Sequence, residues 1–305
     1  MCGVAADAAL FWEHHADLSG QSRYGRPRLR RLRRGAGPAF CLPHPGGEVV
    51  SVLAAGAYAR TGVRHCLALD VGTSTVRLWS PATATVISEP AVIVPRPDGR
   101  HVVGRAALDA TITRGATPLW PVRDGLVHDF FGCMHLLRML VTGVGQLDDT
   151  AAPVLVGVPA TATLRQKNML VAVVRRAVGG RVTAVEEPLA AALACRPDPG
   201  REDVIAVDIG FGRTEVARIV DRSVAAAERV GEGNPVDQLV AIAACVRRMD
   251  VPGAGTGRRR LLITGGGAAT PGVAARLAAL TGRSVTIPSD PLLATLTGLR
   301  RLLTG

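Results

Sequence analysis

The sequence contains few aromatic residues and almost no lysine. Aromatic side chains account for 3% of the 305 residues, and Lys167 is the one lysine, so arginine supplies every other basic side chain. Hydrophobic residues nevertheless account for 48% of the sequence. We therefore expect a globular chain whose core is built from Ala, Val, Leu and Ile and whose length allows two domains.

Further absences narrow the class of protein. No apolar run approaches the length of a membrane-spanning helix, and the amino terminus lacks the apolar segment of a secretory signal. The six cysteines include no C-x-x-C pair, which predicts free thiols in a reducing cytoplasm rather than a zinc site. There is no P-loop, because Lys167 does not follow a glycine-rich loop. We expect a cytoplasmic protein.

The net charge of +11 draws on an arginine-rich run, RPRLRRLRRG, near the amino terminus. Such a run could form a basic arm for nucleic acid or anionic lipid. The aromatic residues that would stack on bases are missing from it. Runs of like charge are usually solvated tails, so we expect residues 1–64 to form a disordered extension, and we do not expect nucleic acid as a partner.

Two later segments repeat one pattern, LALDVGTSTVRL at 67–78 and VIAVDIGFGRTEVARI at 204–219. In each, an apolar run ends in Asp, and a glycine-containing turn leads into a second apolar run that carries Thr. The pattern predicts a β-hairpin whose turn presents backbone N–H groups beside a carboxylate. A phosphate fits the amides, and a divalent metal held through water fits Asp70 and Asp208. Two unrelated hairpin turns are the alternative.

A third glycine motif, ITGGGAATPG at 263–272, predicts a strand, a tight turn and a helix. Glycines there let the backbone approach a ligand, and the start of a helix favours anions; a plain tight turn is the alternative. From residue 65 onward strands and helices alternate, which favours an α/β fold. The expected strands are 66–70, 75–80, 85–94, 101–103, 154–160, 181–185, 223–229, 261–264 and 284–287, together with the two strands of the hairpin at 204–220. The expected helices are 104–113, 129–141, 164–178, 188–196, 235–248, 271–281 and 291–303.

Taken in order, these motifs resemble the actin-like ATPase superfamily, most closely its MreB-type bacterial actin homologues, the rod shape-determining proteins. The resemblance covers about residues 65–305. It extends to WPVRDGLVHDF (120–130), GVPATAT (157–163), VEEPLAAALA (185–194) and SDPLLATLTG (289–298).

The resemblance implies two ribonuclease-H-like domains around a nucleotide cleft that holds ATP and Mg²⁺. Residues 65–150 would form the first lobe and 151–305 a truncated second lobe. Asp70 and Asp208 would sit near the metal, and Asp208 would act in catalysis with Glu187, which would position the attacking water; Glu186 is the fallback. An exposed helix start, where acids favour the dipole, is the alternative for these two glutamates. The phosphates would contact Gly72, Thr73, Ser74, Thr75, Gly210, Gly212, Arg213 and Thr214, and the nucleoside would contact Gly265, Gly266 and Gly267.

This chain departs from the family pattern in three places. Phe211 replaces a glycine and Arg213 replaces a threonine of the family pattern. Arg213 could still pair with a phosphate, but we expect ATP hydrolysis to be at most weak. The stretch between the second and third glycine motifs is roughly half the family's length, so the small subdomain of the second lobe is expected to be largely missing and ATP affinity to be weak. In the loop that inserts into the membrane in the family, Asp148 and Asp149 leave Leu147 as the apolar tip, which argues against strong direct membrane insertion.

The resemblance therefore implies an MreB-like cytoskeletal protein, shortened relative to its family, that acts in cell shape or cell-wall morphogenesis. Its expected partners are itself or a full-length MreB-type filament, together with proteins of cell-wall synthesis or morphogenesis. A partner would bring it to the inner face of the membrane. Two alternatives stay open: an active ATPase or phosphotransferase of the same superfold, and a protein that binds nucleic acid through its arginine-rich arm.

Overall fold

The computed structural model describes residues 66–82, 86–142, 152–195, 203–231, 234–250 and 260–304. All of them belong to the larger of two units, Glu48–Gly305. The predictions for the extension 1–64 and for the loop carrying Leu147, Asp148 and Asp149 lie outside the described residues.

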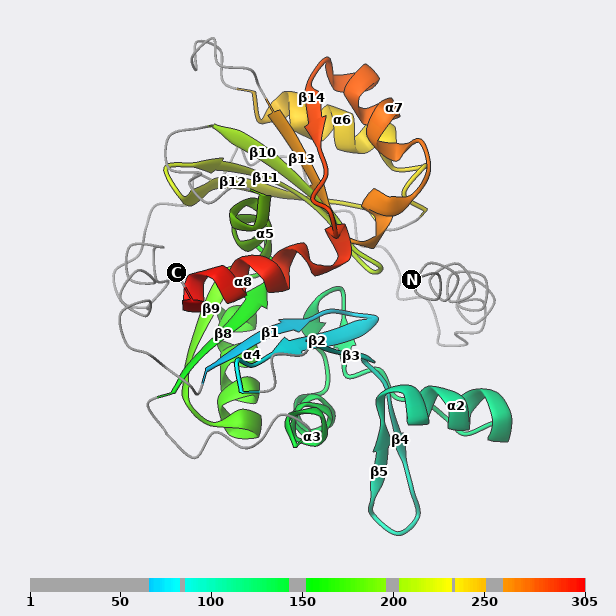
Figure 1. The fold of residues 1–305 in the computed structure, drawn as a ribbon. Helices are drawn as coiled ribbons and strands as arrows, with labels where there is room; N and C mark the ends of the chain where they lie inside the picture. Colours follow the sequence, from blue (N-terminus) through cyan, green and yellow to red (C-terminus); the bar gives the residue numbers. More distant parts are fainter. Residues whose placement is uncertain are drawn as a thin grey trace, which may run out of the picture. The chain divides into compact units, whose positions relative to one another are not determined.

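The first sheet has the strand order β3-β2-β1-β8-β9 (Figure 1). Its strands are β1 (Leu67–Val71), β2 (Thr75–Trp79), β3 (Val86–Pro90), β8 (Pro153–Val158) and β9 (Arg181–Glu186). β1, β2 and β3 pair antiparallel, and β1, β8 and β9 pair parallel. Strand β1 is buried along its whole length, which is typical of a central strand covered on both faces.

Helices on each face of the first sheet explain this burial. Helices α3 (Phe130–Val141) and α4 (Leu164–Val178) cover one face, where their apolar side chains pack on alternate residues of β1. The other face packs against α5 (Glu187–Cys195) and α8 (Ala294–Thr304). Helix α4 begins at a capping box in which Thr163 and Gln166 bond each other's backbone N–H groups.

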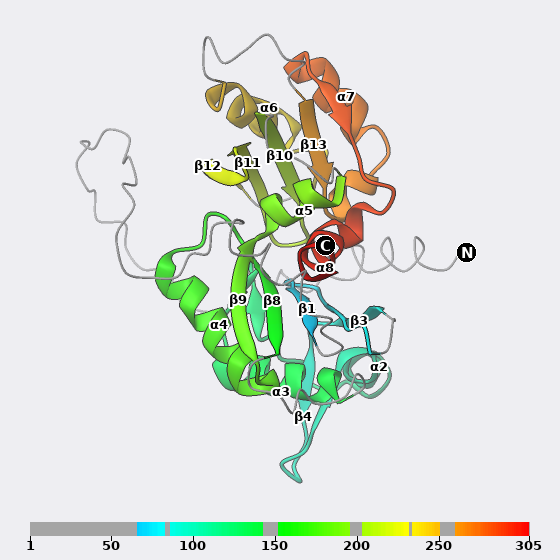
Figure 2. The same ribbon diagram turned by 60° about the vertical axis from the view of Figure 1, so that its left-hand side comes forward.

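The second sheet repeats this plan with the order β12-β11-β10-β13-β14. Its strands are β10 (Val204–Ile209), β11 (Thr214–Val220), β12 (Ser223–Val230), β13 (Arg260–Thr264) and β14 (Ser284–Thr286). Helices α6 (Leu239–Arg248) and α7 (Val273–Thr281) pack on one face, and α5 packs on the other. Figure 2 shows α5 and α8 between the two sheets.

Helices α5 and α8 cross very closely. A Cβ at Gly298 of α8 would overlap the backbone of Ala190 in α5, so only glycine allows this approach. Arg301 of α8 also donates to the carbonyl of Leu193, at 2.7 Å. Between β12 and β13, α6 is the one helix within the described residues.

Three features differ from the sequence-based expectations. The sheets do not divide at residue 150: β8 and β9 lie within the predicted second lobe, yet β8 pairs with β1 and β9 pairs with β8, because the α3 and α4 crossovers return the chain to the first sheet. The single strand expected at 85–94 is two strands. Its second half, β4 (Ile93–Pro95), leaves the sheet to pair with β5 (His101–Val103), and α2 (Gly104–Arg114) follows.

A short hairpin, β6 (Val122–Arg123) and β7 (Leu126–Val127), was not expected. None of the helices in the described ranges is both long and apolar enough to span a membrane.

Candidate functional site

The first hairpin joins β1 to β2 through a tight turn that begins at Gly72. The N–H of Gly72 donates to the carbonyl of Thr75 at 3.0 Å, and a Cβ on Gly72 would lie 3.0 Å from the same oxygen. Asp70, just before the turn, is buried and pairs with Arg77 of β2 at 3.1 Å. Burial raises the pKa of the Asp70 carboxyl, and Arg77 offsets part of that rise.

The second hairpin, from β10 to β11, repeats this turn. Gly210 donates to the carbonyl of Arg213 at 2.8 Å, and a Cβ on Gly210 would again lie 3.0 Å from that oxygen. Asp208 accepts from the hydroxyl of Thr264 on β13 at 2.9 Å. Burial is the main cause that raises the pKa of Asp208 to about 6. The two predicted hairpins therefore share one turn geometry.

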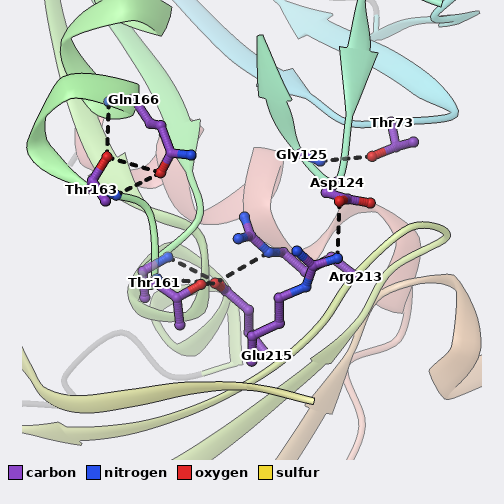
Figure 3. A network of polar contacts seen from close by, with 10 residues as sticks. Thr73, Asp124, Gly125, Thr161, Thr163, Gln166, Arg213 and Glu215 are labelled. Atoms are coloured by element: carbon purple, nitrogen blue, oxygen red, sulfur yellow. Dashed lines mark hydrogen bonds and ion pairs between the residues drawn. The ribbon is translucent and has the colours of Figure 1, made fainter. Parts of the chain in front are cut away.

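The tips of the two hairpins meet each other and the β6–β7 turn (Figure 3). A Cβ on Gly212 would lie 3.1 Å from the hydroxyl of Thr73. That hydroxyl accepts from the N–H of Gly125 at 2.7 Å. Asp124, which has a left-handed φ of 52° in the same turn, pairs with Arg229 of β12 at 3.0 Å. The Asp-Gly dipeptide is a strong hairpin signal, so the sequence could have revealed this third turn.

The predicted glutamates at the start of α5 face different surroundings. Glu187 is 9% exposed, and burial raises its pKa well above the ordinary value, with the carboxylates of Asp70 and Asp208 adding to the rise. Glu186 instead pairs with Lys167 of α4 at 2.7 Å. The structure thus groups Glu187, and not Glu186, with the two aspartates.

Glu215 is a buried carboxylate of the site that the sequence did not single out. It accepts from the backbone N–H groups of Ala160 and Thr161, at 2.9 and 3.0 Å, and from the Thr161 hydroxyl. Its carboxylate lies 3.6 Å from Nε of Arg213, and a dashed line marks this ion pair in Figure 3. A charged residue inside an otherwise apolar strand was the available signal, because such a residue is seldom buried without partners.

The remaining predicted residues have mixed surroundings. The Ser74 and Thr75 hydroxyls lie 3.3 Å apart in the first turn, and Thr214 is buried in β11. Gly265, with φ of 81°, lies against Asp208: a Cβ there would lie 2.8 Å from its carboxylate.

The rest of the triple glycine forms the 3₁₀ turn η2 (Gly266–Ala269), and a second 3₁₀ turn, η3 (Pro291–Leu293), lies beside it. A Cβ on Gly267 would overlap the side chain of Ile209, and one on Gly266 would lie 3.3 Å from Leu292. Packing at the ends of β10 and β13 is therefore enough to explain why glycine occupies positions Gly265 and Gly267.

The charges of the site suit a cation and an anion together. Beyond the effect of burial, the carboxylates of Asp70 and Asp208 raise the pKa of Glu187, and that of Asp70 raises the pKa of Asp208, so a divalent cation would relieve their repulsion. No three His, Cys, Asp or Glu side chains in the described ranges could hold a metal by themselves. Arg213 has buried N–H groups that find no acceptor among the described residues, and these groups suit a phosphate oxygen.

Comparison with known proteins identifies the family. The family model described as MreB/Mbl protein matches residues 64–249. The cell shape-determining protein MreB of Haemophilus influenzae is 31% identical over 167 residues, which cover 50% of this chain and 47% of that protein. The Escherichia coli K12 protein of the same name is 31% identical over 164 residues, with the same shares covered. The chain thus spans about half the length of the curated relatives it matches.

Solved structures share the fold. MreB 5 of Spiroplasma citri bound to AMPPNP superposes with a TM-score of 0.68 at 17% identity, covering 78% of this chain and 95% of the other. The MamK double helical filament gives a TM-score of 0.62 at 18% identity, covering 79% and 99%. A family model that matches more than half of the chain and this shared architecture lead to one conclusion: the chain belongs to the MreB/Mbl family and has the fold of the actin-like ATPases.

Proposed function

We propose that this protein is an MreB-type cytoskeletal protein that binds ATP with Mg²⁺ weakly and acts in cell shape or cell-wall morphogenesis. The observation that carries the proposal is the meeting of two alike Asp-Gly hairpins with Asp70, Asp208 and Glu187 buried beside them. The family membership supports the cytoskeletal role, and the AMPPNP bound to the Spiroplasma protein supports a nucleotide as ligand.

Different residues would bind the metal, orient the phosphates and position the attacking water. Asp70 and Asp208 would hold the hydrated Mg²⁺, which neutralises phosphate charge when bound. The turns that begin at Gly72 and Gly210 would orient the phosphates. Glu187 would position the attacking water and accept its proton, a task suited to a buried carboxyl whose pKa is raised well above its ordinary value. Phosphoryl transfer depends on such positioning more than on covalent chemistry.

Weak binding and poor turnover follow from the second hairpin. Phe211 brings bulk to a turn position that has glycine in the family, which weakens binding, and Arg213 replaces the threonine of the family, which impairs turnover. Gly212 also packs directly on Thr73, so a phosphate between the two tips would first have to separate them. The free energy of that separation would lower the apparent affinity.

The proposed partners are a second copy of this chain or a longer MreB-type filament, and proteins of cell-wall synthesis or morphogenesis. The filament formed by MamK, which shares the fold, supports self-association. We place the protein in the cytoplasm, from which a partner would bring it to the inner face of the membrane.

Calorimetric titration with ATP·Mg²⁺, run beside a phosphate-release assay, tests the proposal. We expect weak binding that needs Mg²⁺, little phosphate release, and loss of binding in Asp208→Asn. Asp109→Asn, on the exposed face of α2, is the matched control and should bind as the wild type does. Absence of binding at millimolar ATP·Mg²⁺ would overturn nucleotide binding. Tight binding with steady turnover would favour the active ATPase instead.

A further inference from the structure

Arg213 carries a buried positive charge whose hydrogen-bonding capacity is only partly used. Its side chain is 10% exposed. Its Nε and Nη1 atoms are buried and have no hydrogen-bond partner within the part of the chain that the structure describes. Guanidinium donors taken out of water without an acceptor are destabilising, because they lose hydrogen bonds that they would make in solution. An acceptor brought by a ligand would restore them.

Glu215 anchors this guanidinium without satisfying it. The carboxylate of Glu215 is occupied by three donors from Ala160 and Thr161. Its distance of 3.6 Å from Nε of Arg213 is that of an ion pair and exceeds that of a normal hydrogen bond. Glu215 therefore fixes where the guanidinium lies and leaves its N–H groups available to another acceptor.

The guanidinium lies where three turns converge. Nη1 would be 3.7 Å from a Cβ on Gly125 in the β6–β7 turn. The backbone of Arg213 closes the second hairpin, whose tip residue Gly212 contacts Thr73 of the first. Figure 3 shows Arg213 extending between Glu215 and the turn of Asp124 and Gly125. A phosphate held by the two hairpins would thus have this cation as a neighbour.

We propose that Arg213 determines specificity in this site by binding a tetrahedral oxyanion, namely the terminal phosphoryl group of a bound nucleoside triphosphate. The inference rests on the proposed nucleotide site and adds the group that separates triphosphate from diphosphate. Arginine suits this role because it is always charged and its planar donors match phosphate oxygens. Nucleotides that lack the terminal group, or that lose it on hydrolysis, would leave the buried charge without its acceptor.

Binding of ATP·Mg²⁺ and ADP·Mg²⁺ by wild type, Arg213→Gln and Arg213→Lys, measured by calorimetry, tests the assignment. Charge-assisted hydrogen bonds predict that wild type prefers ATP by about tenfold or more. Arg213→Gln should lose that preference through weaker ATP binding, with ADP binding changed by less than about twofold. Arg213→Lys keeps the charge without the planar donors and should retain part of the preference. Arg218→Gln, which removes a partly buried arginine of the same strand that pairs with Asp203, is the control and should retain all of it.

Inorganic phosphate added to the ADP titration tests whether free phosphate, like the terminal phosphoryl group of ATP, can occupy the oxyanion position. A gain in ADP affinity that depends on Arg213 would show that free phosphate also occupies the oxyanion position. Equal affinities for ATP and ADP in wild type would overturn the inference and leave the nucleotide site standing. An equal loss of affinity for ATP and ADP in Arg213→Gln and Arg213→Lys would also overturn the inference, since that result fits a purely structural ion pair. Wild type that binds neither nucleotide would instead overturn the proposed function.

Discussion

The two hairpins have one backbone design and opposite electrostatics. Each has an aspartate before the turn and a glycine N–H that closes it. At the cross-strand position that faces the aspartate, however, the first hairpin has Arg77 and the second has Glu215. Asp70 is therefore charge-paired within its own hairpin, whereas Asp208 depends on a threonine hydroxyl and faces a second acid. The comparison shows that turn geometry and charge can diverge separately, and it places the unbalanced negative charge on the second hairpin.

Replacing the two facing residues should give the largest effect and the clearest contrast. Glu215→Ala leaves three donors and the Arg213 charge without their acceptor, so we expect a loss of about 3–5 kcal/mol in unfolding free energy. Arg77→Ala removes one ion pair and should cost about 1–2 kcal/mol. Urea unfolding at pH 7 measures both. Equal losses would show that Glu215 is no more important to its hairpin than Arg77 is to the other.

The pH dependence of stability should differ between Asp208→Asn and the wild type. The pKa of Asp208 is raised to about 6 in the folded protein, against about 4 in an unfolded chain. The folded state therefore binds this proton more tightly, and its contribution to stability is present below pH 4 and is lost as pH rises through 6. The loss is about 2–3 kcal/mol for this group.

Urea unfolding at several pH values between 4 and 7 checks this expectation, with Asp208→Asn showing a flatter profile than wild type. A matched Asp70→Asn variant should change the profile less, because Arg77 offsets part of the burial effect there. Identical profiles for wild type and Asp208→Asn would contradict the unbalanced charge of the second hairpin.

The smallest effect tests the shared turn itself. Gly72→Ala and Gly210→Ala each place a Cβ 3.0 Å from a backbone carbonyl oxygen, so each should cost a similar amount, about 1–2 kcal/mol. Gly231→Ala, which has no neighbouring atom within 4 Å, should be close to neutral. Thermal unfolding of the three variants would measure this, and a large difference between the first two would mean that the hairpins are not alike.

Local features of the site could be predicted from the sequence, whereas contacts between distant segments could not. Asp70, Gly72, Asp208 and Gly210 follow from turn chemistry that a few neighbouring residues determine. The pairing of β8 with β1 depends on crossovers through whole helices. The distinction between Glu186 and Glu187 depends on Lys167, a residue of another helix.

Glu215 is a second residue whose role depends on contacts with distant segments. Its burial is intelligible only once Thr161 and Ala160 are known to face it, and these residues follow a strand of the other sheet. Gly267 likewise has a packing partner, Ile209, that no local pattern reveals. Sequence motifs thus identified the chemical groups more readily than the partners that fix their charge and position.

The position of α8 has a consequence for how this protein is made. Its residues, 294–304, cover the face of a sheet whose central strand is formed by residues 67–71. During synthesis α8 can cover that strand only after more than two hundred further residues have been added. Contacts so distant in sequence slow folding and expose intermediates to aggregation. The nascent chain is therefore expected to need protection, by a chaperone or by the ribosome, for longer than a protein whose sheets are completed in order.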